Sequence, residues 1–232
     1  MKVLLFGRDG CNSSRKLYKQ LVKYNFEVTY VESTKRSKLL SEEILSWHGD
    51  YILSFRNLYF LPKDLLSAAN KLAINFHPGP PEYPGSGCIN FALYNNEKTF
   101  GVTSHLMNEF IDNGKIIKAV RFEVKPNDNL DTLLKKTHKE LEILAMETIE
   151  KIYNDEQNFI DKIINNPATI AWRGKGRKMI EVDKLQNIPL ETSKQELEKI
   201  IRSCHSEDFP VSLNLHGYRF LLSTQNKHNQ SK

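Results

Sequence analysis

The sequence has few cysteines and lacks the long apolar runs that several protein classes require. Its three cysteines, Cys11, Cys88 and Cys204, are odd in number and are not spaced as metal ligands, which argues against a disulfide framework and a structural zinc site. Each is expected to be a small buried apolar side chain. No stretch approaches the roughly 18 uninterrupted apolar residues of a membrane span. We therefore predict no metal and no membrane contact.

A secretion signal is also not expected. The apolar run in MKVLLFGRDG is short, and a polar, glycine-containing loop follows where a signal peptide would continue. The expected location is the cytoplasm. Hydrophobic residues make up 40% and charged residues 26% of the 232 residues, which is typical of one globular domain with a small appendage. The net charge of +5 suits an anionic substrate.

Short apolar segments alternate with helical segments in the first part of the chain. Strands are predicted over residues 2–6, 26–31, 51–55 and 72–76. Helices are predicted after a cap at Ser13 or Ser14, over 39–47 and from Pro62 onward. The first helix would bury Leu17, Leu21 and Val22. This alternation indicates an α/β fold: a Rossmann-like, mostly parallel sheet flanked by helices, with ligands at the carboxyl ends of the strands.

The pattern changes near residue 165. Before it, a helix is predicted near 89–94, strands over 101–107 and 115–124, and a long helix over about 130–153, capped by Asp128 or Asn129. After it we predict a strand over 179–182, a helix over 192–203 and a β-hairpin turning at His216-Gly217. The predicted units are a main domain, residues 1–165, and a small C-terminal α+β subdomain, residues 166–232, whose last residues from about Gln225 are expected to fray.

Two polar motifs follow neighbouring strands. The first is the proline- and glycine-rich segment 74–87, in which Asn75 and His77 are two residues apart and so share one side of a strand. The second joins Gly101-Val102-Thr103-Ser104-His105 to the loop Asp112-Asn113-Gly114. Taken one at a time, each residue has an ordinary structural explanation. Asn75 suits the end of a strand, His77 suits a histidine buried in the core, and Asp112 suits a turn. Because all three lie at the ends of consecutive strands, together they indicate a catalytic site.

An amide, an imidazole and a carboxylate suit acyl transfer to an amine. The amide or an imidazolium can stabilise negative charge on the acyl oxygen. The imidazole can move the protons near neutral pH, and a carboxylate can orient it. No nucleophilic Ser or Cys is needed, because the amine itself attacks. His48, His105 and His138 have no metal spacing and are expected to be structural.

The Asn75-x-His77-Pro78 segment, the Gly101-Val102-Thr103-x-His105 strand and Asp112-x-Gly114 resemble the catalytic signature of the 10-formyltetrahydrofolate-dependent formyltransferases. The resemblance covers residues 1–155. It implies that Asn75, His77 and Asp112 are catalytic and that 10-formyltetrahydrofolate is the co-substrate. It also implies cofactor contacts, and the residues expected to make them are Leu53, Ser54, Phe55, Leu106, Met107 and Asp112.

The residues after His77 resemble the sugar N-formyltransferases of this family. Relatives that act on glycinamide ribonucleotide or methionyl-tRNA usually carry Ser-Leu-Leu-Pro there, whereas this chain has Pro-Gly-Pro-Pro-Glu-Tyr-Pro-Gly. The resemblance implies a nucleotide-linked amino-dideoxy sugar as acceptor, for which we favour thymidine-diphosphate (dTDP) 4-amino-4,6-dideoxyglucose. The C-terminal hairpin resembles a dimer contact of these enzymes, so a homodimer is expected. The residues expected to touch the acceptor are Gly7, Arg8, Pro78, Gly79, Pro80, Glu82 and Tyr83.

Several alternatives stay open at this point. Gly7-Arg8-Asp9-Gly10 fits a plain tight turn as well as an anion contact, and Glu82 and Tyr83 fit a solvent-facing turn. The basic segment 172–178 fits a solvated turn, a diphosphate contact or an RNA contact. The acceptor could be another amine, such as glycinamide ribonucleotide or methionyl-tRNA. Only residues 166–232 remain for binding a tRNA, so no nucleic acid is expected. A 10-formyltetrahydrofolate hydrolase and a non-catalytic nucleotide sensor complete the list.

Overall fold

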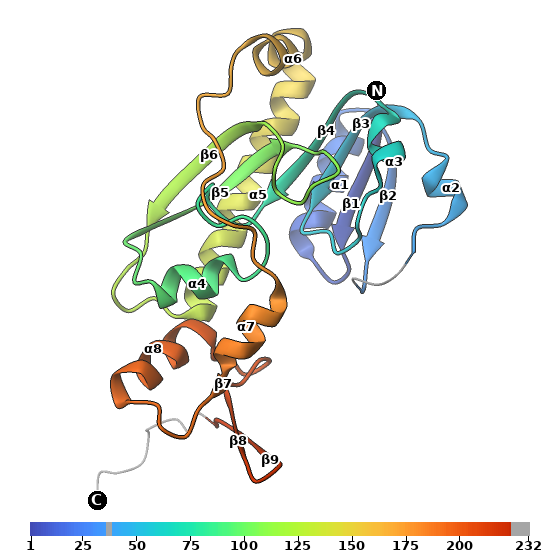
Figure 1. Ribbon diagram of the computed structural model, residues 1–232. Helices are drawn as coiled ribbons and strands as arrows, with labels where there is room; N and C mark the ends of the chain where they lie inside the picture. The colour runs from blue at the N-terminus through green and yellow to red at the C-terminus, as the bar shows by residue number, and fades with distance from the viewer. Residues whose placement is uncertain (36–38, 224–232) are drawn as a thin grey trace, which may run out of the picture.

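A computed structural model describes residues 1–35 and 39–223 (Figure 1). The tail from about Gln225, for which fraying is predicted, lies outside the described residues. Among the described residues, none of the helices has the length and apolar character needed to cross a bilayer. The main sheet contains β1 (Lys2–Arg8), β2 (Glu27–Ser33), β3 (Gly49–Phe55), β4 (Ala69–His77), β5 (Thr99–Leu106) and β6 (Ile116–Glu123).

The six strands lie in the order β2-β1-β3-β4-β5-β6. The first four strands in the chain run parallel, and β5 and β6 each pair antiparallel with their neighbour. The prediction of a mostly parallel sheet flanked by helices is confirmed. The carboxyl ends of β1, β3 and β4 therefore meet at one edge of the sheet, where ligands of such folds bind.

Side chains of the central strands alternate between two hydrophobic cores. Val3 and Leu5 of β1 face α1 (Asn12–Lys23), α5 (Leu130–Asn154) and α6 (Glu156–Asn165). Leu4 and Phe6 face the opposite layer, which contains α2 (Glu42–Leu45) and α3 (Lys63–Ser67). Because successive residues of a strand point to opposite faces, one continuous apolar run fills both layers.

The long helix α5 begins where the sequence predicts. Asn129 accepts a hydrogen bond from the backbone N–H of Thr132, whose hydroxyl accepts one from the backbone N–H of Asn129. This reciprocal arrangement is a capping box. Leu133, Leu141 and Leu144 of the predicted apolar stripe are fully buried. Helix α4 (Cys88–Tyr94) lies near the predicted 89–94.

Some local predictions are wrong. Helix α1 begins at Asn12 after Cys11 and has no side-chain cap; instead Ser14 accepts a hydrogen bond from the backbone N–H of Arg8. Val22 is 46% exposed, because only Leu17 and Leu21 of that stripe face the sheet. The helix predicted over 39–47 contains a helical stretch only at α2.

The strand predicted over 179–182 is also wrong, because these residues begin α7 (Met179–Gln186). The Glu181 carboxylate accepts from the backbone N–H of Lys178, which starts a helix, and of the predicted apolar run only Val182 is buried. Helix α8 (Lys194–Cys204) is capped by Ser193, inside the predicted range.

The hairpin is confirmed. Strands β8 (Ser212–Leu215) and β9 (Tyr218–Leu221) pair antiparallel, and β7 (Asn187–Ile188) adds a third strand. His216 and Gly217 have φ values of 49° and 83°, as a tight primed turn requires. The C-terminal elements pack on the main domain, since Asn90 of α4 donates to the backbone carbonyl of Ser203 in α8.

Candidate active site

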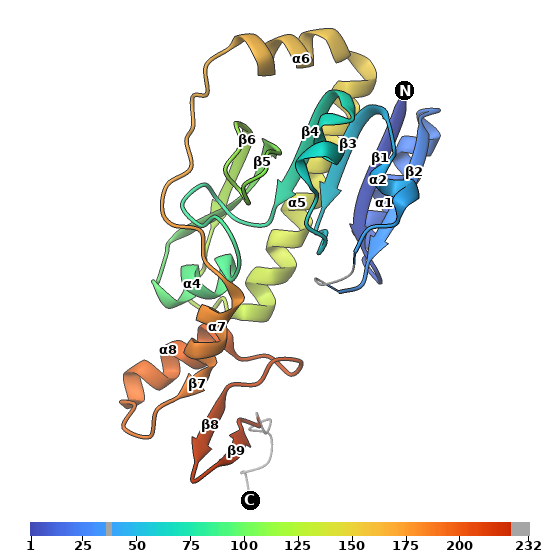
Figure 2. The same ribbon diagram turned by 45° about the vertical axis from the view of Figure 1, so that its right-hand side comes forward.

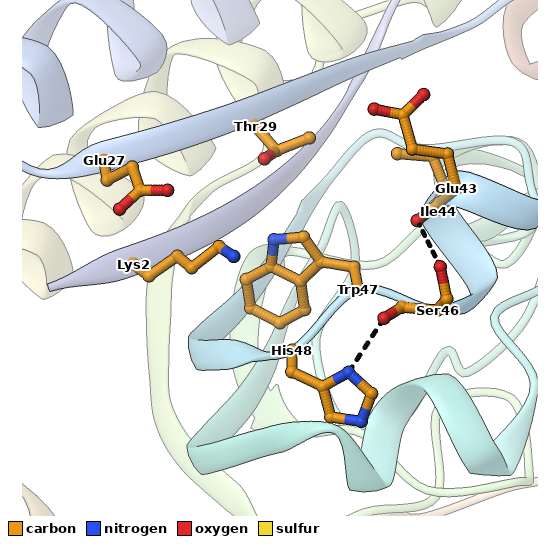
Figure 3. A pocket seen from close by; sticks show the side chains of 8 residues that line it. All are labelled: Lys2, Glu27, Thr29, Glu43, Ile44, Ser46, Trp47 and His48. Atoms are coloured by element: carbon orange, nitrogen blue, oxygen red, sulfur yellow. Dashed lines mark hydrogen bonds between the residues drawn. The ribbon is translucent and has the colours of Figure 1, made fainter.

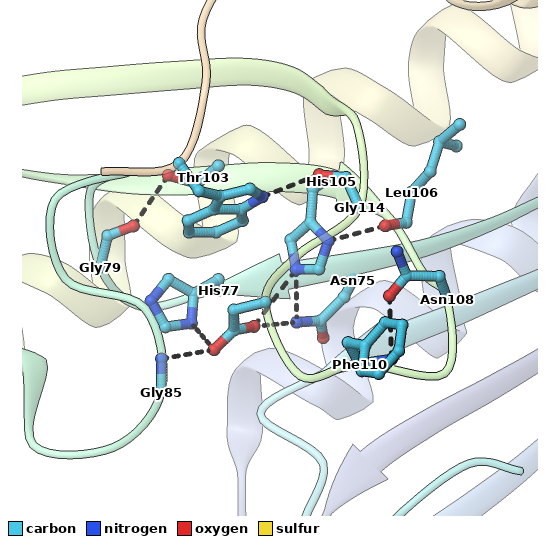
Figure 4. Close-up of polar contacts among 12 residues, drawn as sticks. Asn75, His77, Gly79, Gly85, Thr103, His105, Leu106, Asn108, Phe110 and Gly114 are labelled. Carbon is cyan, nitrogen blue, oxygen red and sulfur yellow. Dashed lines mark hydrogen bonds and ion pairs between the residues drawn. The ribbon is translucent and has the colours of Figure 1, made fainter. Parts of the chain in front are cut away.

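Asn75 and His77 end β4 and project to the same side of the sheet. The antiparallel register places Asn75 opposite His105 of β5, and His77 opposite Thr103. Directly opposed side chains of antiparallel strands touch, and Asn75 Nδ2 lies 3.0 Å from His105 Nε2. Figure 4 shows Asn75, His77 and His105 turned toward one another. The strand pairing therefore adds a second imidazole to the predicted pair.

Asp112 lies at the centre of this cluster. One carboxylate oxygen, Oδ2, is 3.1 Å from His77 Nδ1 and accepts a hydrogen bond of 2.8 Å from the backbone N–H of Gly85. The other, Oδ1, is 3.3 Å from His105 Nε2 and 3.4 Å from Asn75 Nδ2. Asn75, His77 and Asp112, which the sequence predicts to act together, are thus in contact, and Asp112 touches every other member.

The backbone around Asp112 explains the spacing Asp112-x-Gly114. Asp112 has a φ of 46°, in the left-handed region that aspartate tolerates better than most residues. A Cβ atom at Gly114 would lie 1.8 Å from the carbonyl oxygen of Leu106, so the loop can close only with glycine there. The loop returns to β5 through a hydrogen bond from Leu106 N to Lys115 O. This closure holds the Asp112 carboxylate under the two imidazoles.

The charges of the cluster reinforce one another. Burial by itself would lower the pKa of His77, but the Asp112 carboxylate and the Cys88 thiol nearby outweigh it and raise that pKa well above its ordinary value. Burial would raise the pKa of Asp112, but His77 and His105 outweigh it and lower that pKa. At neutral pH the geometry therefore favours an imidazolium at His77 and a carboxylate at Asp112.

His105 and Trp172 are the members that sequence reasoning missed. His105 is only 2% exposed, and its Nδ1 donates to the carbonyl of Leu106, which turns Nε2 toward Asn75 and Asp112. The sequence places it in the motif Gly101-Val102-Thr103-x-His105 but predicts a structural role, because its spacing to other histidines indicates no metal site. The indole ring of Trp172 lies edge-on to His77 and His105, with ring centroids 5.6 Å and 5.0 Å away.

The proline-rich loop is tied to the cluster by internal contacts. His77 Nε2 donates to the carbonyl of Tyr83, and Thr103 donates to the carbonyl of Gly79. A Cβ atom at Gly79 would lie 2.6 Å from His77 Nε2, so this glycine allows the loop to approach the imidazole. Of the neighbouring prolines, Pro78 is half-buried and Pro80 is buried. The loop thereby fixes the second nitrogen of His77.

Glu82 and Tyr83 have internal partners rather than free side chains. The Tyr83 ring is 6% exposed, and its hydroxyl donates to Glu97 and accepts from Asn95. Glu82 pairs with Arg121 at 2.7 Å. The predicted acceptor contacts at these two positions would have to use the backbone or displace a partner.

A group of cations lies at the carboxyl ends of β1 and β3. Gly7 is buried and Arg8 is exposed. Arg56, which follows β3, donates to the Cys11 sulfur at 3.3 Å. Burial, together with the charges of Arg56 and Arg8, lowers the pKa of His138 to about 4. Within the described ranges, neither Arg8 nor Arg56 has an ion-pair partner. Sequence reasoning found only Arg8, because Arg8, Arg56 and His138 come from separate segments.

The residues expected to touch the folate occupy two kinds of position. The side chains of Leu53 and Phe55 are buried in the hydrophobic core and Ser54 is 5% exposed, so only the strand end at Phe55 is available to a ligand. Leu106 and Met107 lie on the segment that leads to Asp112. That segment carries two exposed apolar side chains, Phe110 and Ile111, at 63% and 72% exposure.

Two cavities lie outside this cluster. One of about 350 Å³ is bordered by Lys2, Glu27 and Trp47 at the amino ends of the strands (Figure 3); it contains none of the predicted site residues. The other, of about 340 Å³, is bordered by Gly114 and Trp172 beside the cluster. In the part of the chain that is described, no group of three or more His, Cys, Asp or Glu side chains is arranged to hold a metal ion.

Comparison with known proteins places this cluster in a family. Residues 8–149 match the family described as Formyl transferase. The chain belongs to the formyl transferase family. The resemblance drawn from the sequence motifs is confirmed, and all three motifs lie inside the matched region of the formyl transferase domain.

Two kinds of relatives are similar to this formyl transferase chain. The methionyl-tRNA formyltransferase of Ehrlichia canis is 30% identical over 150 residues, covering 61% of this chain. The chain spans 49% of that relative, about half its length. A solved sugar N-formyltransferase from Shewanella sp. has a TM-score of 0.77 at 18% identity, and the match covers 96% of both chains.

A further solved structure is an N-formyltransferase from Helicobacter canadensis in complex with folinic acid and dTDP-3-aminofucose. Its TM-score is 0.70 at 18% identity, covering 94% of this chain and 85% of that one. At these identities the likeness establishes the fold. The formyl transferase fold here extends over nearly the whole chain, including the C-terminal elements beyond residue 149.

Proposed function

We propose that the protein transfers the formyl group of 10-formyltetrahydrofolate to the amino group of a nucleotide-linked amino-dideoxy sugar. The observation that carries the proposal is the buried contact of Asn75, His77 and Asp112 at the carboxyl edge of the sheet. It is supported by the fold, which matches a sugar N-formyltransferase along 96% of both chains. The preferred acceptor is dTDP-4-amino-4,6-dideoxyglucose.

The three catalytic residues divide the work. Asn75 is the most exposed of them, so its amide would donate to the formyl oxygen as negative charge builds there, exchanging its contact with His105 or Asp112 for one to the substrate. The His77 imidazolium would add positive charge and give a proton to the leaving folate nitrogen. The neutral imidazole left behind then accepts the proton lost by the attacking amine. Asp112 holds Nδ1 of His77, so these exchanges would use Nε2, which must leave the carbonyl of Tyr83 when the substrates bind.

Asp112 has an electrostatic role in this scheme. Its lowered pKa makes it a poor proton acceptor near neutral pH, and both of its oxygens already accept contacts from the protein. A carboxylate so placed keeps His77 charged and fixes the orientation of its ring. We therefore assign Asp112 to holding the imidazolium and His77 to moving the protons.

The folate would bind against the segment that carries Asp112. Exposed apolar side chains beside a polar cluster indicate a surface that a ligand covers, and Phe110 and Ile111 flank Asp112 in this way. Leu106 and Met107 extend the surface toward β5. Of the contacts expected along β3, Leu53 and Ser54 are least available, because both edges of the strand are paired there.

The acceptor's diphosphate would bind at Arg8 and Arg56. These cations lie beside the amino end of α1, where backbone N–H groups and the helix dipole also favour an anion. Burial, and to a smaller extent the charge of Arg8, lowers the pKa of Arg56, and burial with both arginines lowers the pKa of His138. A nucleotide diphosphate supplies the missing negative charge.

We further propose a homodimer and two units in the chain. Residues 1–165 would form the catalytic unit, and α6 ends at Asn165. Residues 166–232 would form the dimer contact through the hairpin. There Tyr218, Phe220 and Leu221 of the edge strand β9 are 73%, 53% and 57% exposed, and a partner chain would cover these apolar side chains.

Methionyl-tRNA is the second candidate acceptor, because the curated relatives include methionyl-tRNA formyltransferases at 30% identity. One structural observation counts against an RNA contact at the basic segment 172–178. Arg173 approaches Glu82 at 3.8 Å, and the Arg177 guanidinium stacks on Phe91 at 4.4 Å. Of the four cations of this segment, Arg177 is therefore held within the protein, while the side chain of Arg173 is 74% exposed.

The experiment is an acceptor panel. Tetrahydrofolate release from 10-formyltetrahydrofolate is followed with thymidine- and guanosine-diphosphate amino sugars, glycinamide ribonucleotide, methionyl-tRNA and no acceptor. Turnover with one nucleotide sugar, and a product heavier by one formyl group, supports the proposal. Turnover only with another amine would make that amine the acceptor in place of the sugar. Equal turnover without any acceptor would indicate a hydrolase. No turnover at all would favour a nucleotide sensor.

A further inference from the structure

The chain crosses the active site between α6 and α7. Figure 2 shows this connection running from α6 past β5 and β6 to α7. Its residues 172–177, which we call the strap, follow the family match, which ends at residue 149. The strap hydrogen-bonds along the proline-rich loop: Arg173 N donates to Pro81 O at 2.8 Å, and Ser86 N donates to Arg177 O at 2.9 Å. Main-chain bonds of this kind fix the strap in place.

Trp172 begins the strap and lies against both imidazoles. Its Nε1–H donates to the carbonyl of Gly114 at 2.7 Å, which anchors the ring on the loop that carries Asp112. The ring meets His77 and His105 edge-on. One side chain thus contacts the Asp112 loop and both histidines, which come from two strands.

The other end of the strap acts on the same cluster through the backbone. Gly85 donates its N–H to Asp112, and a Cβ atom at Gly85 would lie 2.4 Å from the carbonyl oxygen of Arg177. The Arg177 guanidinium lies 5.5 Å from the ring centroid of Tyr83, whose carbonyl accepts from His77. The strap therefore packs against the donors and acceptors that hold both His77 and Asp112.

We propose that Trp172 is a positioning residue that seals the Asn75–His77–Asp112 site against water. This inference rests on the proposed formyl transfer. A dry site strengthens the attraction between His77 and Asp112, because water screens charges strongly. It also protects the formyl group: if water attacks instead of the amine, its oxygen bonds to the formyl carbon, the carbon–nitrogen bond to folate breaks, the folate nitrogen gains a proton, and formate leaves.

The test compares Trp172→Ala and Trp172→Phe with Trp47→Phe. Trp47 is the only other tryptophan, and it lies beside the cavity at the opposite edge of the sheet. The first measurement is the ratio of formate to formylated acceptor for each tetrahydrofolate released. We expect Trp172→Ala to raise this ratio by about tenfold or more. Trp172→Phe keeps an aromatic ring but loses Nε1, so its ratio should lie between those of wild type and Trp172→Ala. Trp47→Phe should keep the wild-type ratio.

The second measurement needs no substrate. The groups that contact His77 are Asp112 on the loop after β5, Cys88 on α4, the carbonyl of Tyr83 and the indole of Trp172. The further titratable group of the cluster, His105 on β5, contacts Asp112. NMR titration of the imidazoles should show a shifted His77 midpoint in Trp172→Ala, because entering water changes both the burial of His77 and its attraction to Asp112. The midpoint should stay unchanged in Trp47→Phe. Thermal melting confirms that each variant is folded.

The outcomes separate this inference from the proposed function. A folded Trp172→Ala protein with the wild-type formate ratio and the wild-type His77 midpoint would overturn the role of Trp172. A wild-type protein that releases no tetrahydrofolate with any acceptor would overturn the proposed function, and the titration would still decide whether Trp172 shields the pair. A shifted midpoint in Trp172→Ala and not in Trp47→Phe, together with a raised formate ratio, supports the inference.

Discussion

The Asp112 carboxylate lies 3.1 Å from the His77 imidazole, and both side chains are buried, with 9% and 3% of their surface exposed. Salt and water screen such a pair far less than a surface ion pair. Removing one partner of a buried pair leaves the other charge uncompensated, which is more costly than removing both. The two residues therefore act as one unit, and changing either should alter the protonation of the other.

Replacing Asp112 with Asn tests this coupling. Burial would then dominate at His77, and the pKa of His77 should fall from well above its ordinary value to below it. The imidazole would be neutral at pH 7, and formyl transfer should decrease by about 10²- to 10⁴-fold. NMR titration of His77 together with initial rates checks both effects. A variant that keeps His77 protonated at pH 7 would show that Asp112 does not set its charge.

The same coupling predicts how stability depends on pH. The raised pKa of His77 contributes stability that is full below its unfolded value of about 6.5 and is lost as pH rises through the folded value. The lowered pKa of Asp112 contributes stability that is full above about 3.9 and is lost as pH falls through the folded value. Urea unfolding of wild type and Asp112→Asn should therefore differ most between about pH 4 and 6.5. A difference independent of pH would contradict this account.

Gly114→Ala should disable the site without touching a catalytic side chain. The added Cβ would lie 1.8 Å from Leu106 O, so the loop carrying Asp112 must move. A misplacement of about 1 Å can cost about 100-fold in rate, and we expect a loss of that size with a lower melting temperature. Asn113→Ala, an exposed neighbour in the same loop, is the control and should change stability by less than about 0.5 kcal/mol. Equal activity in Gly114→Ala and Asn113→Ala would show that the close approach of Gly114 to the carbonyl of Leu106 does not position Asp112.

Arg8 and Arg56 are expected to bind the acceptor and not the folate. Arg8→Ala should raise KM for the nucleotide sugar by about 10- to 100-fold, the effect of losing one charged hydrogen bond, and leave KM for 10-formyltetrahydrofolate unchanged. Lys19→Ala, which removes an exposed charge from α1, is the control. Adding the nucleotide diphosphate should also raise the pKa of His138 from about 4, because an anion offsets the two arginines. An unmoved His138 signal would place the diphosphate elsewhere.

The hairpin prediction concerns assembly. Leu213 and Leu215 of the hairpin are half-buried within the protein, whereas Tyr218 and Phe220 are exposed, so Phe220→Asp and Tyr218→Asp are the changes that test the interface. Light scattering should give twice the 26.9 kDa chain mass for wild type and the chain mass for the double variant. A wild-type monomer, or a dimer that survives both charges, would remove the hairpin from the interface.

The sequence predicts the fold and the three central residues because both depend on local patterns. The runs that form β1 to β4 are apolar over several residues, Asn75 and His77 end a strand, and Asp112 follows one. His105 was missed because its role depends on its pairing with Asn75 across two strands, and such register is not visible in a single segment. The strand predicted at Met179 failed because a capping glutamate three residues after Lys178 favours a helix.

The remaining members of the site come from distant segments. Trp172 reaches the cluster because the chain returns across the proline-rich loop after α6, and nothing near residue 172 encodes that path. Arg56 and His138 join Arg8 only when β3 and α5 pack beside β1. Long-range packing of this kind decides which side chains meet, while composition and spacing decide only which elements form.

The most direct test of the account is a competition between acceptors. Purified protein and 10-formyltetrahydrofolate are mixed with dTDP-4-amino-4,6-dideoxyglucose and methionyl-tRNA, and the formyl content of each product is measured by mass spectrometry, with Asp112→Asn as the inactive control. The account predicts that wild type formylates the sugar nucleotide and leaves the tRNA unmodified. Formylation of the tRNA alone would contradict the proposed acceptor, and formylation by Asp112→Asn at the wild-type rate would contradict the proposed site.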